Sequence, residues 1–314
     1  MPKYRNHLPQ MSEDVFLADG GLETTLIFHE GVELPEFAAF VLLKDQAGRQ
    51  HLLDYYRRYA SIARDAKVGL VLDSATWRAN PDWGLKIGYS SEALAEANRC
   101  SIELCRRVRD ESETETTKMP ISGCLGPRGD GYRADTMMLP DEAQEYHGGQ
   151  IETFRATGAD FVSAITMTYV NEAIGVTRAA QAAGMPAVVS FTVETDGRLP
   201  DGSTLAQAID SVDEASDQGP EYYMINCAHP THFQDALKAG AGWTDRIRGV
   251  RVNASTCSHA ELDEAEELDE GNPVELGSQL RALRDAFPQI TVLGGCCGTD
   301  HRHVEEIGRA CVVN

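Results

Sequence analysis

The sequence predicts an α/β fold in which eight parallel strands close into a single (β/α)8 TIM barrel, one domain spanning residues 1–314. Short β-branched, apolar runs alternate with longer runs of helical period along the chain, which is typical of βα units around a parallel sheet. Eight is also the number of strands at which inward-facing side chains just fill a closed barrel. An open doubly wound sheet is disfavoured, because no G-x-G-x-x-G turn follows any expected strand.

The expected strands and helices alternate in order along the chain. The strands cover residues 15–19, 68–73, 119–124, 160–166, 186–193, 222–227, 247–253 and 290–296. Apolar residues recurring near the 3.6-residue period predict helices at 52–67, 91–111, 179–184 as the end of a longer stretch, and 301–312. Two acidic runs, 111–118 and 259–271, are expected to be solvated loops, because runs of charge usually face water.

The charge of the chain argues against two classes of partner. A net charge of -21 repels nucleic-acid phosphates and anionic lipid, so we expect neither nucleic acid nor a membrane as partner. The first residues contain no apolar core of a signal peptide, and no run of about 18 apolar residues occurs, so we expect a cytoplasmic protein. The sequence leaves open whether the chain forms a homo-oligomer.

Three of the eight cysteines are placed to converge at one point. Cys227 ends the sixth expected strand, and Cys296 and Cys297 end the eighth. Because the C-terminal ends of barrel strands meet at one mouth, we expect the three thiols to lie together there. Glycines beside the adjacent pair permit the sharp turn that lets both thiols face one ion; they are Gly294, Gly295 and Gly298.

The chemistry of three thiolates predicts a catalytic zinc site. Zinc prefers four tetrahedral ligands, so three cysteines leave one position open for a substrate thiol. Zinc lowers the pKa of a bound thiol, and the thiolate can then attack an alkyl group. In a long chain of cytosolic type a disulfide framework is the minor alternative. We expect the other cysteines to lie outside the metal shell; they are Cys100, Cys105, Cys124, Cys257 and Cys311.

The motifs GGCCGT (294–299), an upstream NC (226–227) and DGGLET (19–24) resemble those of the zinc-dependent homocysteine S-methyltransferase family, which includes betaine, S-methylmethionine and cobalamin-dependent methionine synthase modules. The resemblance spans about the whole chain. It implies Cys227, Cys296 and Cys297 as zinc ligands, and it places the amino-acid part of the thiol substrate at Asp19, Gly20 and Gly21. Asn253 resembles an asparagine of the family at the end of strand seven, and GPRGDGY (126–132) resembles its Gly-Pro loop.

Two of these residues also have simpler interpretations. A carboxylate at Asp19, where strand one ends, suits pairing with an ammonium group. Asp19 would equally cap the turn through Gly20 and Gly21, since Asp is favoured in turns. Asn253 would equally be a hydrogen-bonded residue at a strand end.

The chain departs from the family pattern at two places. After strand four the family carries a glutamate that helps bind the amino group of homocysteine, and Ile165 stands there in this chain. Either Glu172 or Glu194 replaces it, or the acceptor is not homocysteine. At the end of strand two, Trp77 with Trp83 would offer a cation-binding face to a sulfonium or quaternary ammonium methyl donor, the alternative being a packed loop.

The sequence therefore predicts a zinc-dependent S-methyltransferase that moves a methyl group from a small diffusible donor to a zinc-bound thiol. Homocysteine, giving methionine, is the first candidate acceptor. The alternatives are the same chemistry on another thiol, a redox protein using Cys296 and Cys297, and a zinc-binding sensor without turnover. Zn²⁺ is the expected cofactor, and no motif for a tightly bound organic cofactor is present.

Overall fold

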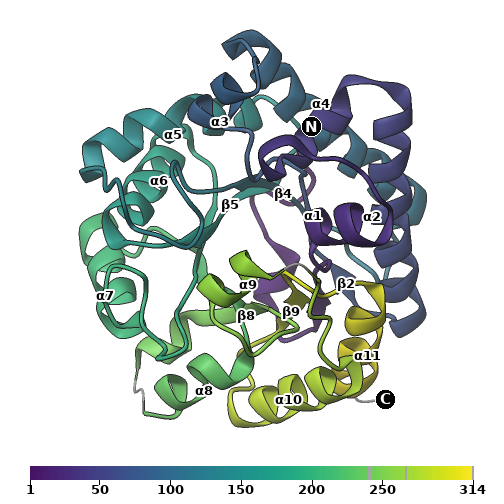
Figure 1. Cartoon of the computed structure of the whole chain (residues 1–314), viewed down its shortest axis with the longest axis vertical. Coiled ribbons are helices and arrows are strands. Elements are labelled where there is room, and N and C mark those ends of the chain that lie inside the picture. The colour runs from purple at the N-terminus through teal and green to yellow at the C-terminus, as the bar shows by residue number, and fades with distance from the viewer. Residues whose placement is uncertain (240–241, 266, 313–314) are drawn as a thin grey trace.

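The computed structural model describes residues 1–239, 242–265 and 267–312, and its strands form one parallel sheet that closes on itself (Figure 1). The strand order is β2-β1-β9-β8-β7-β6-β5-β4-β3. The strands are β1 (Phe16–Leu17), β2 (Gly69–Leu70), β3 (Leu72–Asp73), β4 (Ile121–Leu125), β5 (Phe161–Met167), β6 (Ala187–Phe191), β7 (Tyr222–Ala228), β8 (Ile247–Val252) and β9 (Val292–Gly295).

The two ends of this order are halves of one strand, so the barrel is closed. β2 and β3 are separated only by Val71, whose N–H donates to the carbonyl of Leu17 at 2.8 Å. The next N–H along, from Leu72, donates in the opposite direction to Pro120 at 3.0 Å. Residues 69–73 thus bond alternately to both neighbours, as an interior barrel strand does. The predicted eight-stranded barrel is confirmed, with the second expected strand assigned as two short elements.

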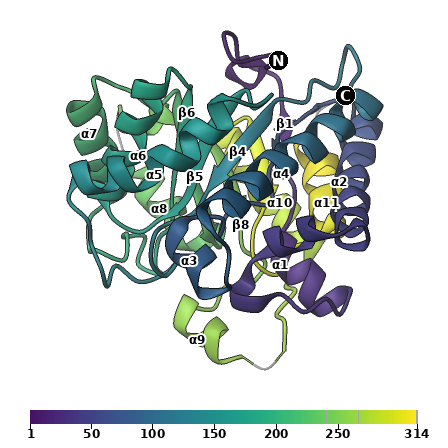
Figure 2. The ribbon, with the colours of Figure 1, turned by 90° about the horizontal axis from the view of Figure 1, so that it is seen from above.

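Most of the helices surround the strands as an outer ring, and a few short ones lie at one end of the barrel (Figures 1 and 2). They are α1 (Leu22–Thr24), α2 (Gln46–Ala66), α3 (Pro81–Lys86), α4 (Ser91–Ser112), α5 (Pro140–Arg155), α6 (Val170–Ala183), α7 (Leu205–Ser216), α8 (Pro230–Lys238), α9 (His259–Glu264), α10 (Pro273–Ala286) and α11 (His301–Cys311). The side chain of Asp45 caps α2 by accepting the N–H of Gly48 at 2.8 Å, and Ser90 caps α4 in the same way. Both long predicted helices therefore begin a few residues before or at their expected starts.

One expected loop contains a helix. Residues 259–271 include α9, which begins with a capping box: the Ser258 hydroxyl accepts the Glu261 N–H at 3.3 Å, and the Glu261 carboxylate accepts the Ser258 N–H at 2.8 Å. The acidic run is therefore not wholly a loop. Figure 1 shows α9 in front of the barrel centre, and Figure 2 shows it at the same end of the barrel as α1 and α3.

Inside the barrel, inward-facing side chains change from apolar to polar toward the C-terminal end of the strands. Side chains alternate along a strand, so residues two apart share a face. On β5, Phe161 belongs to a small apolar cluster in the barrel, whereas Ser163 bonds to the carboxylate of Asp73 at 2.9 Å. On β7, Met224 belongs to the same cluster and Asn226 bonds to Ser190 at 2.6 Å. The polar layer is the floor of the site described next.

None of the helices in the described part of the chain is both long enough and apolar enough to cross a membrane.

Candidate metal centre and active site

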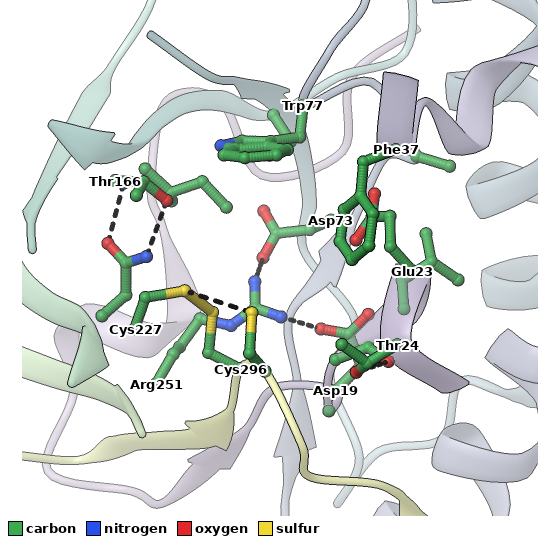
Figure 3. Close-up of a pocket in the computed structure, with 18 of the residues that line it drawn as sticks. Asp19, Glu23, Thr24, Phe37, Asp73, Trp77, Thr166, Cys227, Arg251 and Cys296 are labelled. Atoms are coloured by element: carbon green, nitrogen blue, oxygen red, sulfur yellow. Dashed lines mark hydrogen bonds and ion pairs between the residues drawn. A yellow bond between two sulfur atoms is a disulfide. The ribbon is translucent and has the colours of Figure 1, made fainter. Parts of the chain in front are cut away.

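The ends of β7 and β9 bring Cys227, Cys296 and Cys297 together at the barrel mouth; Figure 3 shows the first two. The three Sγ atoms all lie within 4.8 Å of one another. Cys227 and Cys296 are joined as a disulfide in this structure, and the Sγ of Cys297 lies 4.0 Å from that of Cys227. Among the described residues, these three form the group of His, Cys, Asp and Glu side chains positioned to hold a metal ion.

Two backbone irregularities turn the thiols toward one point. Cys227 has φ +51°, and the register between β7 and β8 shifts between Asn226 and Ala228. After β9 the chain makes a tight turn in which Thr299 N–H donates to the Cys296 carbonyl at 3.1 Å, with Gly298 at φ +77°. Left-handed conformations of this kind re-aim side chains that a regular strand would send to opposite faces.

Of the three glycines expected to permit this turn, only Gly298 has a positive φ. The other two allow close approach: a Cβ on Gly295 would lie 1.9 Å from Thr299 Oγ1, and one on Gly294 would lie 2.7 Å from Ala18 Cβ.

The geometry of the cysteines fits a tetrahedral thiolate site. With Zn–S bonds of about 2.3 Å, tetrahedral geometry places neighbouring sulfurs about 3.8 Å apart. The 4.0 Å between Cys227 and Cys297 is close to that value, and the bond between Cys227 and Cys296 must be reduced before all three sulfurs can bind one ion. Cys124 lines the same pocket but lies outside the cluster, as expected.

The pocket against which the cysteines lie, here called the inner pocket, has a cavity volume of about 70 Å³ and a charged floor. Arg251 on β8 donates from Nη1 to Asp73 at 2.6 Å, from Nη2 to Asp19, and from Nε to the carbonyl of Gly295 at 3.2 Å. Tyr55 donates its hydroxyl to the other oxygen of Asp19 at 3.1 Å. All of these side chains are buried.

This network changes the role expected for Asp19. Burial raises the pKa of Asp19 to about 6 even though Arg251 lies against it. Burial also acts to lower the pKa of Arg251, but the charges of Asp19 and Asp73 outweigh it and raise that pKa. The carboxylate of Asp19 is therefore already paired, which contradicts the expectation that it is available to an ammonium group. Arg251 was missed because a single arginine within a strand carries no motif.

Gly20 and Gly21 bring the end of β1 against the cysteine turn. A Cβ on Gly20 would lie 2.9 Å from the carbonyl of Thr299, and one on Gly21 would lie 2.6 Å from the carbonyl of Cys296. Both glycines line the inner pocket. Close backbone packing, rather than a turn with positive φ, is what these positions require.

The two acids expected to replace the family glutamate lie elsewhere. Glu172 is buried on α6, where its carboxylate accepts the Arg128 N–H at 2.8 Å and lies 2.8 Å from His147 Nε2. It therefore anchors the loop 126–132. Glu194 lies 3.3 Å from His259 Nδ1, and neither acid lines a pocket at the cysteines. The structure therefore does not bring either expected acid to the pockets at the cysteines, whereas Ile165 does line the inner pocket.

Besides Asp19 and Asp73, the structure places one further acid in the inner pocket, Glu23 on α1. Burial raises its pKa to about 7. Glu23 is the glutamate of the DGGLET motif and follows Asp19 by four residues. No rule of spacing distinguished it from the other acids expected near the barrel mouth. Figure 3 shows Glu23 on the same side of the pocket as Thr24 and Phe37.

A second pocket, here called the outer pocket, adjoins the first and has a cavity volume of about 370 Å³. The two share a wall that includes Thr24, Phe37, Trp77, Tyr132 and Cys297. Cys297 is thus the cysteine that faces both pockets.

Tyr132 covers the cysteine cluster from the loop 126–132. Its hydroxyl lies 3.3 Å from the Sγ of Cys297 and 3.7 Å from that of Cys227. Its ring packs against that of His259 on α9, with centroids 4.3 Å apart and the ring planes inclined by 30°. Burial raises the pKa of Tyr132 well above its usual value, so the phenol stays protonated and can donate to sulfur.

The rest of the outer pocket is acidic and partly aromatic. Its carboxylates are Asp130, Asp263, Glu267 and Asp269, against one guanidinium, that of Arg78. Asn253 also lines it; the side chain is buried and its Oδ1 has no hydrogen-bond partner among the described residues. An unpaired buried amide oxygen is an acceptor available to a ligand.

The expected pair of indoles does not form a free cation-binding face. The guanidinium of Arg78 lies 4.2 Å from the ring centroid of Trp77 and 3.8 Å from that of Trp83, so it already occupies the space between them. Trp77 lines both pockets, whereas Trp83 lines neither. Trp77 alone remains a candidate for contact with a substrate.

Comparison with known proteins agrees with this architecture. A model of the homocysteine S-methyltransferase family matches residues 16–311. Methionine synthases from Mycobacterium leprae and Mycobacterium tuberculosis are 26% and 25% identical over 235 and 236 residues, covering 70% of this chain and 18% of theirs. The chain thus spans less than a fifth of their length.

Solved structures with the same fold include the homocysteine methyltransferase MmuM from Escherichia coli. Its oxidised form is 19% identical, with a TM-score of 0.77, and the alignment covers 96% of this chain and 97% of that one. Its metallated form is 20% identical, with a TM-score of 0.75, and the alignment covers 94% and 96%.

Proposed function

The chain belongs to the homocysteine S-methyltransferase family, a family of thiol S-methyltransferases, and from that premise we propose that it methylates a thiol held at a zinc ion on Cys227, Cys296 and Cys297. Homocysteine, giving methionine, is the first candidate acceptor. The observation that carries the proposal is the convergence of three cysteine sulfurs within 4.8 Å where the inner and outer pockets meet.

The donor set suits this chemistry. Zinc held by three thiolates keeps a fourth position open, lowers the pKa of a thiol bound there and leaves that thiolate nucleophilic. The protein then needs no general base, and its residues position the reactants and exclude water. Tyr132, protonated and 3.3 Å from Cys297 Sγ, donates a hydrogen bond to the ligand sulfur and separates the two pockets.

We assign the acceptor to the inner pocket and the methyl donor to the outer pocket. Cys297 borders both, so a thiol at the cysteine cluster would face a donor entering from the outer side. The outer pocket has more carboxylates than cations, and therefore favours a positively charged donor, a sulfonium or a quaternary ammonium compound. A sulfonium donor loses its charge with its methyl group, so its thioether product is held less strongly than the substrate.

The strands in the described part of the chain form one closed parallel barrel, with helices between them. We propose that residues 1–314 act as one barrel domain.

The test combines metal content with product formation. Reduced protein should bind about one zinc per chain, and Cys297→Ser should bind substantially less. Cys257→Ser is the matched control, since Cys257 is exposed and lies outside the cluster. Mass spectrometry should detect methionine from homocysteine with S-methylmethionine, betaine or S-adenosylmethionine as donor.

Two results would overturn the proposal. Unchanged zinc content in Cys297→Ser would exclude the assigned ligands. Metal-free reduced protein with freely titrating thiols would favour the redox alternative, for which the bond between Cys227 and Cys296 is the supporting observation. Bound zinc without methylation of any thiol in a panel would favour a sensor.

A further inference from the structure

The inner pocket contains three carboxylates, and two of them are already paired. Asp19 and Asp73 both bind the guanidinium of Arg251. Glu23 also lines the pocket, and among the described residues no side chain forms a hydrogen bond or ion pair with its carboxylate. The carboxylates on the floor of the pocket are therefore paired with a cation, whereas the carboxylate of Glu23 on α1 is not paired with any other side chain of the described residues.

A carboxylate in this pocket without a cationic side chain beside it lowers the stability of the folded protein when it ionises. Glu23 is partly buried, and burial opposes its ionisation: it outweighs the hydrogen bond with the residue's own backbone and raises the pKa to about 7. Arg78 and Arg251 are near enough to act on Glu23 through their charge, yet neither bonds to it. A cation supplied by a ligand would complete the pairing that the chain leaves open.

Glu23 lies close to the place where a thiol would bind. Its neighbour Thr24 accepts the N–H of Gly298 at 3.4 Å, so the first turn of α1 packs directly on the turn that carries Cys296 and Cys297. Phe37, whose φ is +60°, also lines the inner pocket. Ile165 also lines the pocket, and its aliphatic side chain cannot bind a cation.

We propose that Glu23 is the specificity residue that binds the cationic amino group of the thiol acceptor. The acceptor is thus an aminothiol, with its sulfur at the cysteine cluster and its ammonium group on the α1 wall of the inner pocket. The inference rests on the proposed function for the position of the sulfur. It goes further in assigning amine recognition to α1, away from Ile165 and from the paired carboxylate of Asp19.

The test compares thiols that differ only in the amino group. Isothermal titration calorimetry on the reduced, zinc-loaded full chain would measure binding of homocysteine against 4-mercaptobutanoate, and of cysteamine against 2-mercaptoethanol. The wild type should prefer at least one aminothiol over its amine-free partner by about tenfold or more, as expected for a charge-assisted hydrogen bond in a partly enclosed site. Glu23→Gln should abolish that preference, and Glu23→Asp should retain part of it.

The controls separate recognition from folding. Glu115→Gln changes an exposed acid remote from the pocket and should keep the wild-type preference. Binding of the amine-free thiols should be nearly the same in Glu23→Gln and wild type, which shows that the pocket and metal remain intact. In turnover, Glu23→Gln should raise KM for the aminothiol with little change in kcat.

The outcomes distinguish this inference from the proposed function. A wild-type protein that shows no preference for the aminothiol in either pair, including one that binds none of the four thiols, overturns the role of Glu23. So does an equal preference in wild type and Glu23→Gln, even if methyl transfer is observed. A preference that Glu23→Gln removes supports the assignment even if no donor in the panel supports turnover, which would count against the proposed function alone.

Discussion

Replacing Glu23 by glutamine should stabilise the metal-free, reduced protein at alkaline pH and have little effect near pH 5. Burial raises the pKa of this carboxyl group from 4.5 to about 7. Glutamine has nearly the same shape and cannot ionise, so the variant removes the cost of burying a charge. The stability lost by the wild type as Glu23 ionises is therefore the quantity to be measured.

The sign follows from proton linkage. A carboxyl group with a folded-state pKa above its unfolded value binds its proton more tightly in the folded protein. Its stabilising contribution is fully present below the unfolded pKa, 4.5, and is lost as pH rises through the folded pKa of about 7. That difference in pKa corresponds to about 3.4 kcal/mol at most, and screening by water in the pocket reduces this contribution to roughly 1 to 2 kcal/mol.

Urea denaturation at pH 5 and pH 8.5 would measure the difference in unfolding free energy between the variant and the wild type. We expect Glu23→Gln to gain roughly 1 to 2 kcal/mol more at pH 8.5 than at pH 5. Glu115→Gln, at an exposed position, should show no such dependence. An effect of Glu23→Gln that is the same at both pH values would refute the claim that its carboxyl group ionises at a cost.

Three further substitutions test other parts of the site. Arg251→Met leaves two buried carboxylates without their cation, so calorimetry should show that the unfolding free energy falls by about 3 to 5 kcal/mol. Arg99→Met, at an exposed ion pair, should lower it by less than about 1 kcal/mol. Equal losses in the two variants would contradict the buried network. Tyr132→Phe removes a donor to the cysteine sulfurs and should weaken zinc binding by roughly 10- to 100-fold in chelator competition, and an unchanged affinity would exclude that contact. Trp77→Leu should raise KM for the methyl donor, because Trp77 lines both pockets. Trp83→Leu should lower stability and leave KM unchanged, because Trp83 lines neither pocket. A matching rise in KM for both variants would contradict the assignment of Trp77 to the donor.

The barrel could be predicted because its signal is repeated along the chain. Each strand run is short, apolar and followed by a helical run, so an error at one strand leaves the architecture unchanged. The splitting of residues 69–73 at Val71 could not be predicted, since it arises from the geometry of hydrogen bonds to two neighbours. The helix at 259–264 could have been found, because Ser258 and Glu261 have the spacing of a capping box.

The cysteines of the site could be predicted because strand ends converge in this fold, which makes their position informative. The acids could not be predicted in the same way. Glu172 follows Ile165 by seven residues, but α6 begins at Val170 and turns its carboxylate toward His147 on α5. Which acid faces the substrate depends on the direction of each side chain, and sequence spacing alone does not give that direction.

Arg251 links the departures at the floor of the pocket. An inward-facing arginine in the barrel must be paired, and it takes Asp19 and Asp73 as partners. Because Asp19 is used in this way and Ile165 carries no charge, the floor and the β5 wall together lose the ability to bind an ammonium group. The negative charge that remains for a substrate lies on α1, at Glu23. The pairing of Arg251 with Asp19 and Asp73 does not involve the cysteine side chains. The site can therefore keep methyl transfer to a thiol, while the rest of the acceptor is recognised by α1 and not by the strands.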